Sequence, residues 1–115
     1  MIPHIVTNLL TFAIPTNNLN NIKLSLLSID NLLPKEAKSE EDLKLLRKTL
    51  FVCTRLLEVG NTEVSCACTN LLLRVLQTKS IRKETFDLRE VVEKHVLAIP
   101  LLKEEGMNVL SLIEN

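Results

Sequence analysis

Two stretches in the middle of the chain carry apolar residues at three- and four-residue intervals. Between Ser39 and Val59 these positions form one face of a helix, made by Leu43, Leu46, Leu50, Cys53 and Leu57. Between Asn61 and Gln77 they cover most of the helical circumference, and they include Val64, Ala67, Cys68, Leu71, Leu72, Val75 and Leu76. A helix that is apolar on nearly all sides must pack against several neighbours, so this pattern predicts a stack of helices.

Short-range signals place the ends of these two helices. Ser39 and Asp42 have the spacing of a capping box, in which a side-chain oxygen accepts a hydrogen bond from a free backbone N–H at the start of a helix. Gly60 can adopt the left-handed conformation that ends a helix. Asn61 or Thr62 can then cap the next helix, so we expect a helix–turn–helix with its turn at Gly60.

The N-terminal third shows a looser form of the same pattern. Pro3 can occupy the first position of a helix, whose apolar face is formed by Ile5, Val6, Leu9 and Leu10. After a break at Pro15 and residues 16–21, we expect a second helix from Asn18 to Leu33. Its apolar face is formed by Ile22, Leu26, Ile29 and Leu33. Residues 22–26 also alternate as in a strand, which leaves that alternative open.

The last third of the chain predicts three short helical stretches. Thr85 or Asp87 caps the first, because Asp87 and Glu90 also have capping-box spacing. Its apolar face holds Leu88, Val91 and His95, with Val92 and Val96 beside it. Pro100 begins the second stretch, Gly106 interrupts it, and 107–113 forms the third.

Two of the predicted helices correspond at a fixed offset of 42 residues. The offset sets Ile22 on Val64, Ser25 on Ala67, Leu26 on Cys68, Ile29 on Leu71 and Leu33 on Val75. A period near 40 residues built from packed helices is the signature of an α-solenoid. Chance agreement between two leucine-rich helices is the alternative.

Two segments resemble parts of known helical repeats. Leu50–Cys68 resembles the junction between the second and third helices of an armadillo repeat, because a pair of leucines precedes a short polar turn and Glu63-Val64 begins the next helix. Leu101–Ile113, where Gly106 follows two glutamates, resembles the join between the first and second helices. HEAT repeats are similar to the same segments. The resemblance implies an all-α fold, a right-handed α-solenoid of about two to two-and-a-half repeats.

We expect residues 1–115 to form a single helical-repeat domain that is a segment of a longer repeat array. The pattern opens on what resembles a second helix and closes on another, without the polar capping helices that the ends of solenoids need. Uncapped ends leave apolar faces in contact with water, so we also expect that the chain can associate with itself through them.

The resemblance also implies where partners bind, because the third helices line the concave face of such solenoids. The polar side chains expected on that face are Ser28, Asn31, Lys35, Asn70, Arg74 and Gln77. Asn31 precedes Leu32-Leu33 much as the family's peptide-binding asparagine precedes its apolar pair. The position 42 residues later is Leu73, however, so a ladder of asparagines does not continue. The alternative is that these side chains form an ordinary solvated surface.

The charge balance disfavours nucleic acid and membranes as partners. Lys and Arg together number 14, as do Asp and Glu, so no net field attracts polyanions. A basic cluster of Lys79, Arg82, Lys83 and Arg89 is interrupted by acids, as is typical of a solvated linker. No apolar run approaches the roughly 20 residues that cross a bilayer, and the first residues do not have the pattern of a signal peptide.

The sequence offers no catalytic, cofactor-binding or metal-binding constellation. Gly60 and Gly106 are the only glycines, so there is no phosphate-binding loop. No nucleophile or carboxylate stands at a spacing that supports His95 as a catalytic residue. Cys66 and Cys68 point in nearly opposite directions on a helix and cannot share a metal ion. We interpret all three cysteines as core thiols of a reducing compartment.

We therefore interpret the chain as a non-enzymatic scaffold that binds other proteins. It would be a repeat segment of a subunit in an intracellular assembly of the cytoplasm or nucleus, such as a chromatin, transport or degradation complex, with no small-molecule substrate. One alternative is a free-standing helical bundle with a transcription-related or nucleic-acid-binding role, for which we expect a protruding basic helix. A second is an enzyme with an unrecognised site, for which we expect a deep pocket containing His95 and a titratable neighbour.

Overall fold

The computed structural model describes residues 2–34, 36–84 and 87–114, and in these ranges every regular element is a helix. In chain order the elements are α1 (Ile2–Asn8), η1 (Leu9–Ala13), α2 (Leu19–Leu32), α3 (Glu40–Leu57), α4 (Thr62–Val75), η2 (Lys79–Glu84), α5 (Leu88–Val91), η3 (Val92–Val96), η4 (Pro100–Leu102) and α6 (Lys103–Glu114). The all-α prediction is confirmed, and residues 22–26 are helical rather than extended.

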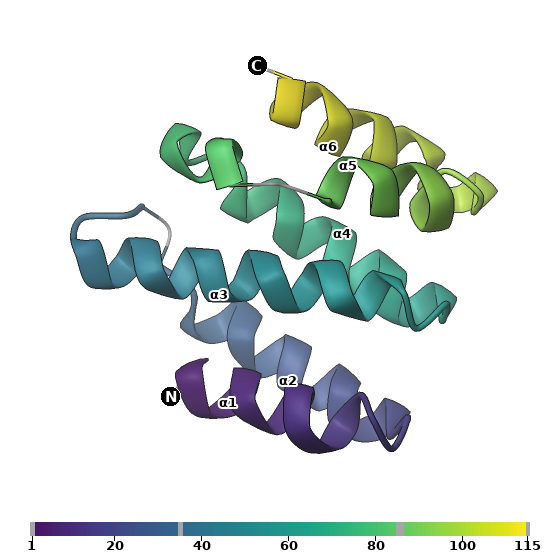
Figure 1. Ribbon diagram of the computed structural model, residues 1–115, viewed down its shortest axis with the longest axis horizontal. Coiled ribbons are helices and arrows are strands. Elements are labelled where there is room, and N and C mark those ends of the chain that lie inside the picture. The colour runs from purple at the N-terminus through teal and green to yellow at the C-terminus, as the bar shows by residue number, and fades with distance from the viewer. Residues whose placement is uncertain (1, 35, 85–86, 115) are drawn as a thin grey trace.

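The helices form three pairs that lie side by side in chain order. α1 with its π-helical extension η1 packs on α2, α3 packs on α4, and α5 with its extension η3 packs with α6. The first helices of neighbouring pairs contact one another, because α1 contacts α3 and α3 contacts α5. The second helices do the same, because α2 contacts α4 and α4 contacts α6, so the helices form two layers (Figure 1). The shortest dimension of the molecule is 21 Å, which fits two layers of helices about 10 Å thick.

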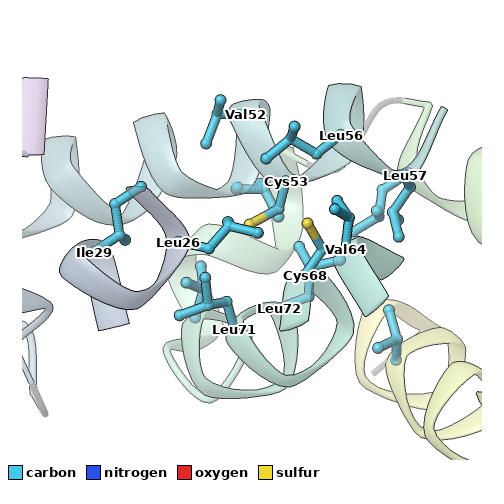
Figure 2. Packing of buried hydrophobic residues seen from close by; sticks show 14 of the residues in the cluster. Leu26, Ile29, Val52, Cys53, Leu56, Leu57, Val64, Cys68, Leu71 and Leu72 are labelled. Atoms are coloured by element: carbon cyan, nitrogen blue, oxygen red, sulfur yellow. The ribbon is translucent and has the colours of Figure 1, made fainter. Parts of the chain in front are cut away.

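Helix α4 lies at the centre of this arrangement. It contacts α3 in its own pair and both α2 and α6 in its layer, as its nearly all-round apolar surface predicts. Figure 2 shows Cys53, Leu56 and Leu57 of α3 facing Val64 and Cys68 of α4 across the middle of the core. All five side chains are fully buried. What remains exposed on α4 is a narrow stripe that includes Glu63, Cys66, Asn70 and Arg74.

Residues of α2 and α4 that are related by the 42-residue offset are buried to a similar extent. Of the five residue pairs related by the 42-residue offset, four are buried on both helices: Ile22 and Val64, Leu26 and Cys68, Ile29 and Leu71, Leu33 and Val75. In the fifth pair Ser25 is buried and Ala67 is half-buried. Both helices also begin with an asparagine cap, because Asn18 Oδ1 accepts from Asn21 N at 3.1 Å and Asn61 Oδ1 accepts from Val64 N at 3.0 Å.

The predicted start of α3 and the predicted turn between α3 and α4 are confirmed. The Ser39 hydroxyl accepts a hydrogen bond from Asp42 N at 3.2 Å at the start of α3. Gly60 has a φ of +81°, which lies in the left-handed region that a side chain disfavours. The predicted helix–turn–helix at Leu50–Cys68 is therefore present, with α3 ending at Leu57 and α4 beginning at Thr62.

Gly106 does not interrupt a helix, and this prediction is wrong. Gly106 lies inside α6, which runs without a break, so Leu101–Ile113 contains no join between two helices at this point. A Cβ atom added to Gly106 would meet Val96 Cγ1 and Leu97 Cδ2, each at 2.9 Å. The glycine is there because α6 approaches η3 closely, and this reason is invisible in the local sequence.

Two other local predictions are also wrong. Asp87 makes no capping hydrogen bond at the start of α5, because its carboxylate instead forms an ion pair with Arg55 of α3. The other candidate cap, Thr85, lies outside the described ranges. Leu10, which we placed on the buried face of the first helix, is 37% exposed beside α3.

Candidate functional site

A groove of about 360 Å³ lies between α2 and α4. Leu26 and Leu71, which are almost fully buried, supply its apolar surface together with the half-buried Ala67. Leu27 also lines the groove, and 58% of its surface is exposed. The polar lining consists of Lys23, Asp30 and Asn70. The groove therefore combines an apolar surface with a few polar groups, which is the usual composition of a binding site.

Two ion pairs connect α2 to α4 along this groove. Lys23 pairs with Glu63 near the start of both helices, and Asp30 pairs with Arg74 near their ends. Arg74 Nη1 also donates to the Asp30 carbonyl oxygen at 3.0 Å. All four side chains are well exposed, so these ion pairs contribute little to the stability of the fold. Their main effect is that the charges of Lys23 and Asp30 are already neutralised within the chain.

The ion pair near the start of α2 and α4 favours the charged form of Glu63. The hydrogen bond from Lys23, together with the positive charge of that lysine, holds the pKa of Glu63 below the ordinary value of a glutamate. Glu63 is therefore ionised at neutral pH and neutralises Lys23. At the other end Asp30 forms an ion pair with Arg74, so Asn70 is the uncharged polar group of the groove.

The structure brings only part of the predicted contact surface together. Asn70 lines the groove, and Arg74 lies at its edge with its guanidinium engaged by Asp30. Ser28 and Asn31 are exposed on α2 but do not line the groove, and Lys35 lies outside the described ranges. Gln77 follows the end of α4, where its Nε2 donates to the Leu73 carbonyl oxygen at 3.1 Å.

The sequence reasoning missed Leu27 and the two residues that hold the ion pairs on α2. Leu27 had a signal, because it falls outside the register of the buried face of its helix and is therefore an exposed large apolar residue. Lys23 and Asp30 had none, because their partners follow them by 40 and 44 residues. Only the stacking of α2 on α4 brings these charges together.

A second hollow, of about 430 Å³, contains His95. Its other lining residues are Glu58, Asp87, Glu90, Val91 and Lys94. Titratable neighbours of His95 are thus present, as the enzyme hypothesis requires. Asp87 and Glu58 are both bound by Arg55, however, and among the described residues that line this hollow there is no Ser, Thr or Cys that could act as a nucleophile. Within the described ranges no group of His, Cys, Asp and Glu is arranged to hold a metal ion.

The three cysteines occupy two different environments. Cys53 and Cys68 are fully buried where α3 meets α4, and both sulfur atoms lie between the two helices (Figure 2). The hydrogen bond with the Cys53 thiol and the burial of both groups raise the pKa of the Cys68 thiol. Cys66 is exposed, so the interpretation as core thiols is correct for two cysteines and wrong for the third.

The basic cluster after α4 is partly engaged within the chain. Arg89 of α5 pairs with Glu93 at 3.3 Å and with Glu114 of α6 at 2.8 Å. Arg82 of η2 donates through Nε to the Leu76 carbonyl oxygen. Two of the four basic side chains of the cluster are thus engaged by groups of the chain itself.

The chain matches no known family model, no curated protein and no solved structure. The resemblance to armadillo and HEAT repeats therefore stays a prediction from the sequence pattern. Of the helices that the structure describes, none combines the length and apolarity needed to cross a bilayer.

Proposed function

We propose that this chain is a non-enzymatic protein-binding segment of an armadillo- or HEAT-like α-solenoid, and that the groove between α2 and α4 receives part of a partner protein. The observation that carries the proposal is the groove itself. It presents an apolar surface, the exposed side chain of Leu27 and the amide of Asn70, for which the described part of the chain provides no hydrogen-bond partner.

The order of the helix contacts supports the solenoid part of the proposal. Each pair packs on the next pair in the chain, and helices of the same layer meet. Solenoids are built in this way, because one helix pair cannot bury its apolar face alone and uses its neighbour for that purpose. The matched burial and matched caps of α2 and α4 are what two successive repeats would show.

The chemistry of the groove indicates the kind of segment that it binds. Because Lys23 and Asp30 are already paired with charges on α4, the groove favours an uncharged apolar side chain. A leucine or phenylalanine of the partner that becomes fully buried there would contribute about 1.5–3 kcal/mol. The amide of Asn70 can both donate to and accept from the partner's backbone.

The expected setting is a multi-protein assembly inside the cell. Three thiols without a disulfide agree with a reducing compartment, and the cytoplasm or the nucleus would provide one. The nucleic-acid alternative requires basic side chains that are free to reach phosphate, and Arg89 instead holds Glu93 and Glu114. A subunit of a chromatin, transport or degradation complex remains the proposal.

The test compares two leucine-to-aspartate variants by pull-down and quantitative mass spectrometry. Leu27→Asp places a charge at the groove, whereas Leu101→Asp changes a leucine of η4 that is 84% exposed and distant from it in the chain. We expect partners to be retained by the wild type and by Leu101→Asp and to be lost by Leu27→Asp. Circular dichroism checks that both variants are folded. Equal capture by Leu27→Asp would show that α2 and α4 do not form the contact surface.

A further inference from the structure

The outer face of the first helix pair is the side of α1, η1 and α2 that is turned away from α3 and α4. This pair lies at one end of the stack (Figure 1). Asn8 Nδ2 donates to Asn21 Oδ1 at 2.8 Å and so joins the two helices. Asn21 stands two residues before Lys23 and nine before Asp30, both of which pair with α4. These spacings put Asn21 on the opposite side of α2 from α4, on the outer face.

Apolar side chains share this face with the two asparagines. Phe12 follows Asn8 by four residues and Leu32 follows Asn21 by eleven, so each lies on the same side of its helix as its asparagine. Phe12 is 48% exposed and Leu32 is 44% exposed. Ile5, three residues before Asn8, is half-buried. Large apolar side chains that are grouped and exposed on one side indicate a contact surface.

The outer face also lacks permanently charged side chains. Within residues 2–34 the sequence has one lysine, Lys23, one aspartate, Asp30, and no arginine or glutamate. Both charges are on the other side of α2, where they pair with Glu63 and Arg74 of α4. Two copies of this face can therefore meet without bringing like charges together.

The two asparagines keep one free group of each kind. Asn21 Oδ1 accepts from Asn8 Nδ2 at 2.8 Å and from Ser25 Oγ at 3.3 Å, which fills both acceptor positions of this oxygen. Asn21 Nδ2 and Asn8 Oδ1 have no hydrogen-bond partner among the described residues. The face thus offers a donor and an acceptor side by side, and a second copy of the same face offers the complement of each.

The opposite end of the stack has a different character. There Arg89 pairs with Glu93 and with Glu114, and Lys103 and Glu104 are exposed on α6. A head-to-tail contact would remove charges of this end from water against an uncharged face that gives them no partner, which is unfavourable. Self-association is therefore favoured through the first pair rather than through both ends.

From the uncharged apolar surface and the complementary amide groups, we infer that the outer face of the first pair binds a second copy of this chain in a two-fold symmetric dimer. A two-fold axis that runs between α1 and α2, parallel to them, sets α1 of each copy on α2 of the other. Asn21 Nδ2 of each copy then donates to Asn8 Oδ1 of the other, and Phe12 and Leu32 become buried. Such an interface closes on itself and stops at two copies.

The size of the face sets the expected affinity. A helix of 14 residues such as α2 is about 21 Å long and a helix pair is about 20 Å wide, so each copy contributes roughly 400 Å². Both copies together stay below the area of stable interfaces, about 1,200–2,000 Å². We expect a weak dimer that is half-formed at roughly 10–100 µM chain.

The experiment is sedimentation equilibrium of the chain over roughly 5–500 µM, at about pH 8 so that histidine side chains are uncharged. We expect the wild type to approach the mass of a dimer at the upper end of this range. Phe12→Asp and Leu32→Asp should each raise the dissociation constant about tenfold or more. Leu101→Asp at the other end of the stack and Leu27→Asp in the α2–α4 groove should dimerise like the wild type, so the two proposals can fail independently.

A pair of asparagine variants tests the amide contact. Asn21→Asp keeps an oxygen that can accept from Asn8 and Ser25, but it removes the N–H groups that the second copy needs. Asn20→Asp adds the same charge at an exposed position about 100° further round α2. Asn21→Asp should weaken the dimer several-fold, Asn20→Asp should leave it unchanged, and circular dichroism should show both variants folded.

Three results would overturn the inference. One is a chain that stays monomeric up to the highest concentration. Another is a series of ever larger oligomers, or association that Leu101→Asp abolishes, because either would indicate head-to-tail contacts. The third is a dimer that Phe12→Asp and Leu32→Asp leave intact, which would place the interface on a different surface.

Discussion

The Gly106→Ala substitution sets two effects of opposite sign against each other. In the interior of α6, alanine is favoured over glycine by about 1 kcal/mol of helix propensity. The new Cβ would lie 2.9 Å from Val96 Cγ1 and from Leu97 Cδ2, whereas carbon atoms prefer roughly 3.5–4.0 Å. The end of Leu97 can rotate away, but Val96 is fully buried and stiff at χ1.

Overpacking of this kind costs about 1–3 kcal/mol. After the gain in propensity is subtracted, we expect Gly106→Ala to lower the free energy of unfolding by between about 0 and 2 kcal/mol. Urea unfolding followed by circular dichroism measures this change. Asn108→Ala, at an exposed position of the same helix, is the control that reports propensity alone.

Gly106→Ala in a protein that also carries Val96→Ala tests whether contact with Val96 is the cause of the destabilisation. Val96→Ala removes one of the two methyl groups that the new Cβ would meet, so Gly106→Ala should become stabilising in that background by up to about 1 kcal/mol. If Gly106→Ala instead stabilised the protein with Val96 in place, α6 would not be held against η3 as closely as described, and the explanation of this glycine would be wrong.

Two further predictions concern thiols and pH. Cys66 should react rapidly with a thiol reagent in the folded protein, whereas Cys53 and Cys68 should react only after unfolding, because they are fully buried and the pKa of Cys68 is raised; rapid labelling of all three would contradict the packing of α3 on α4. The folded-state pKa of Glu63 is lowered. The Glu63 carboxylate therefore contributes to the free energy of unfolding above its unfolded pKa, about 4.3, and this contribution is lost as pH falls through the lower folded pKa. The small stability difference between wild type and Glu63→Gln should therefore shrink in urea titrations below about pH 4, and a difference unchanged by acid would exclude the ion pair.

Most of the helices could be predicted from the sequence, because the signals that define them are local. The spacing of leucines along α3 and the side-chain caps at Ser39 and Asn61 depend only on residues within one or two turns. The same holds for the left-handed turn at Gly60. These features were found where the pattern placed them.

Features that depend on distant residues could not be predicted. Asp87 has the spacing of a cap, but it is bound by Arg55, which is 32 residues away in the chain. Gly106 has the signature of a helix break, but its role depends on Val96 and Leu97 across a helix contact. The α2–α4 groove could be predicted only in part for the same reason. The ion pairs at its two ends join residues of two different helices, and only Asn70 and Leu27 had local signals in the sequence.

The central position of the α3–α4 pair has a consequence for how the molecule opens. This pair is covered on both sides, whereas α1–α2 and α5–α6 are each covered on one side by it. Either outer pair can detach while the rest keeps its core, but loss of the central pair leaves both outer pairs without support. Backbone amides should therefore exchange with solvent most slowly in α3 and α4, and unfolding should proceed from the two ends inward.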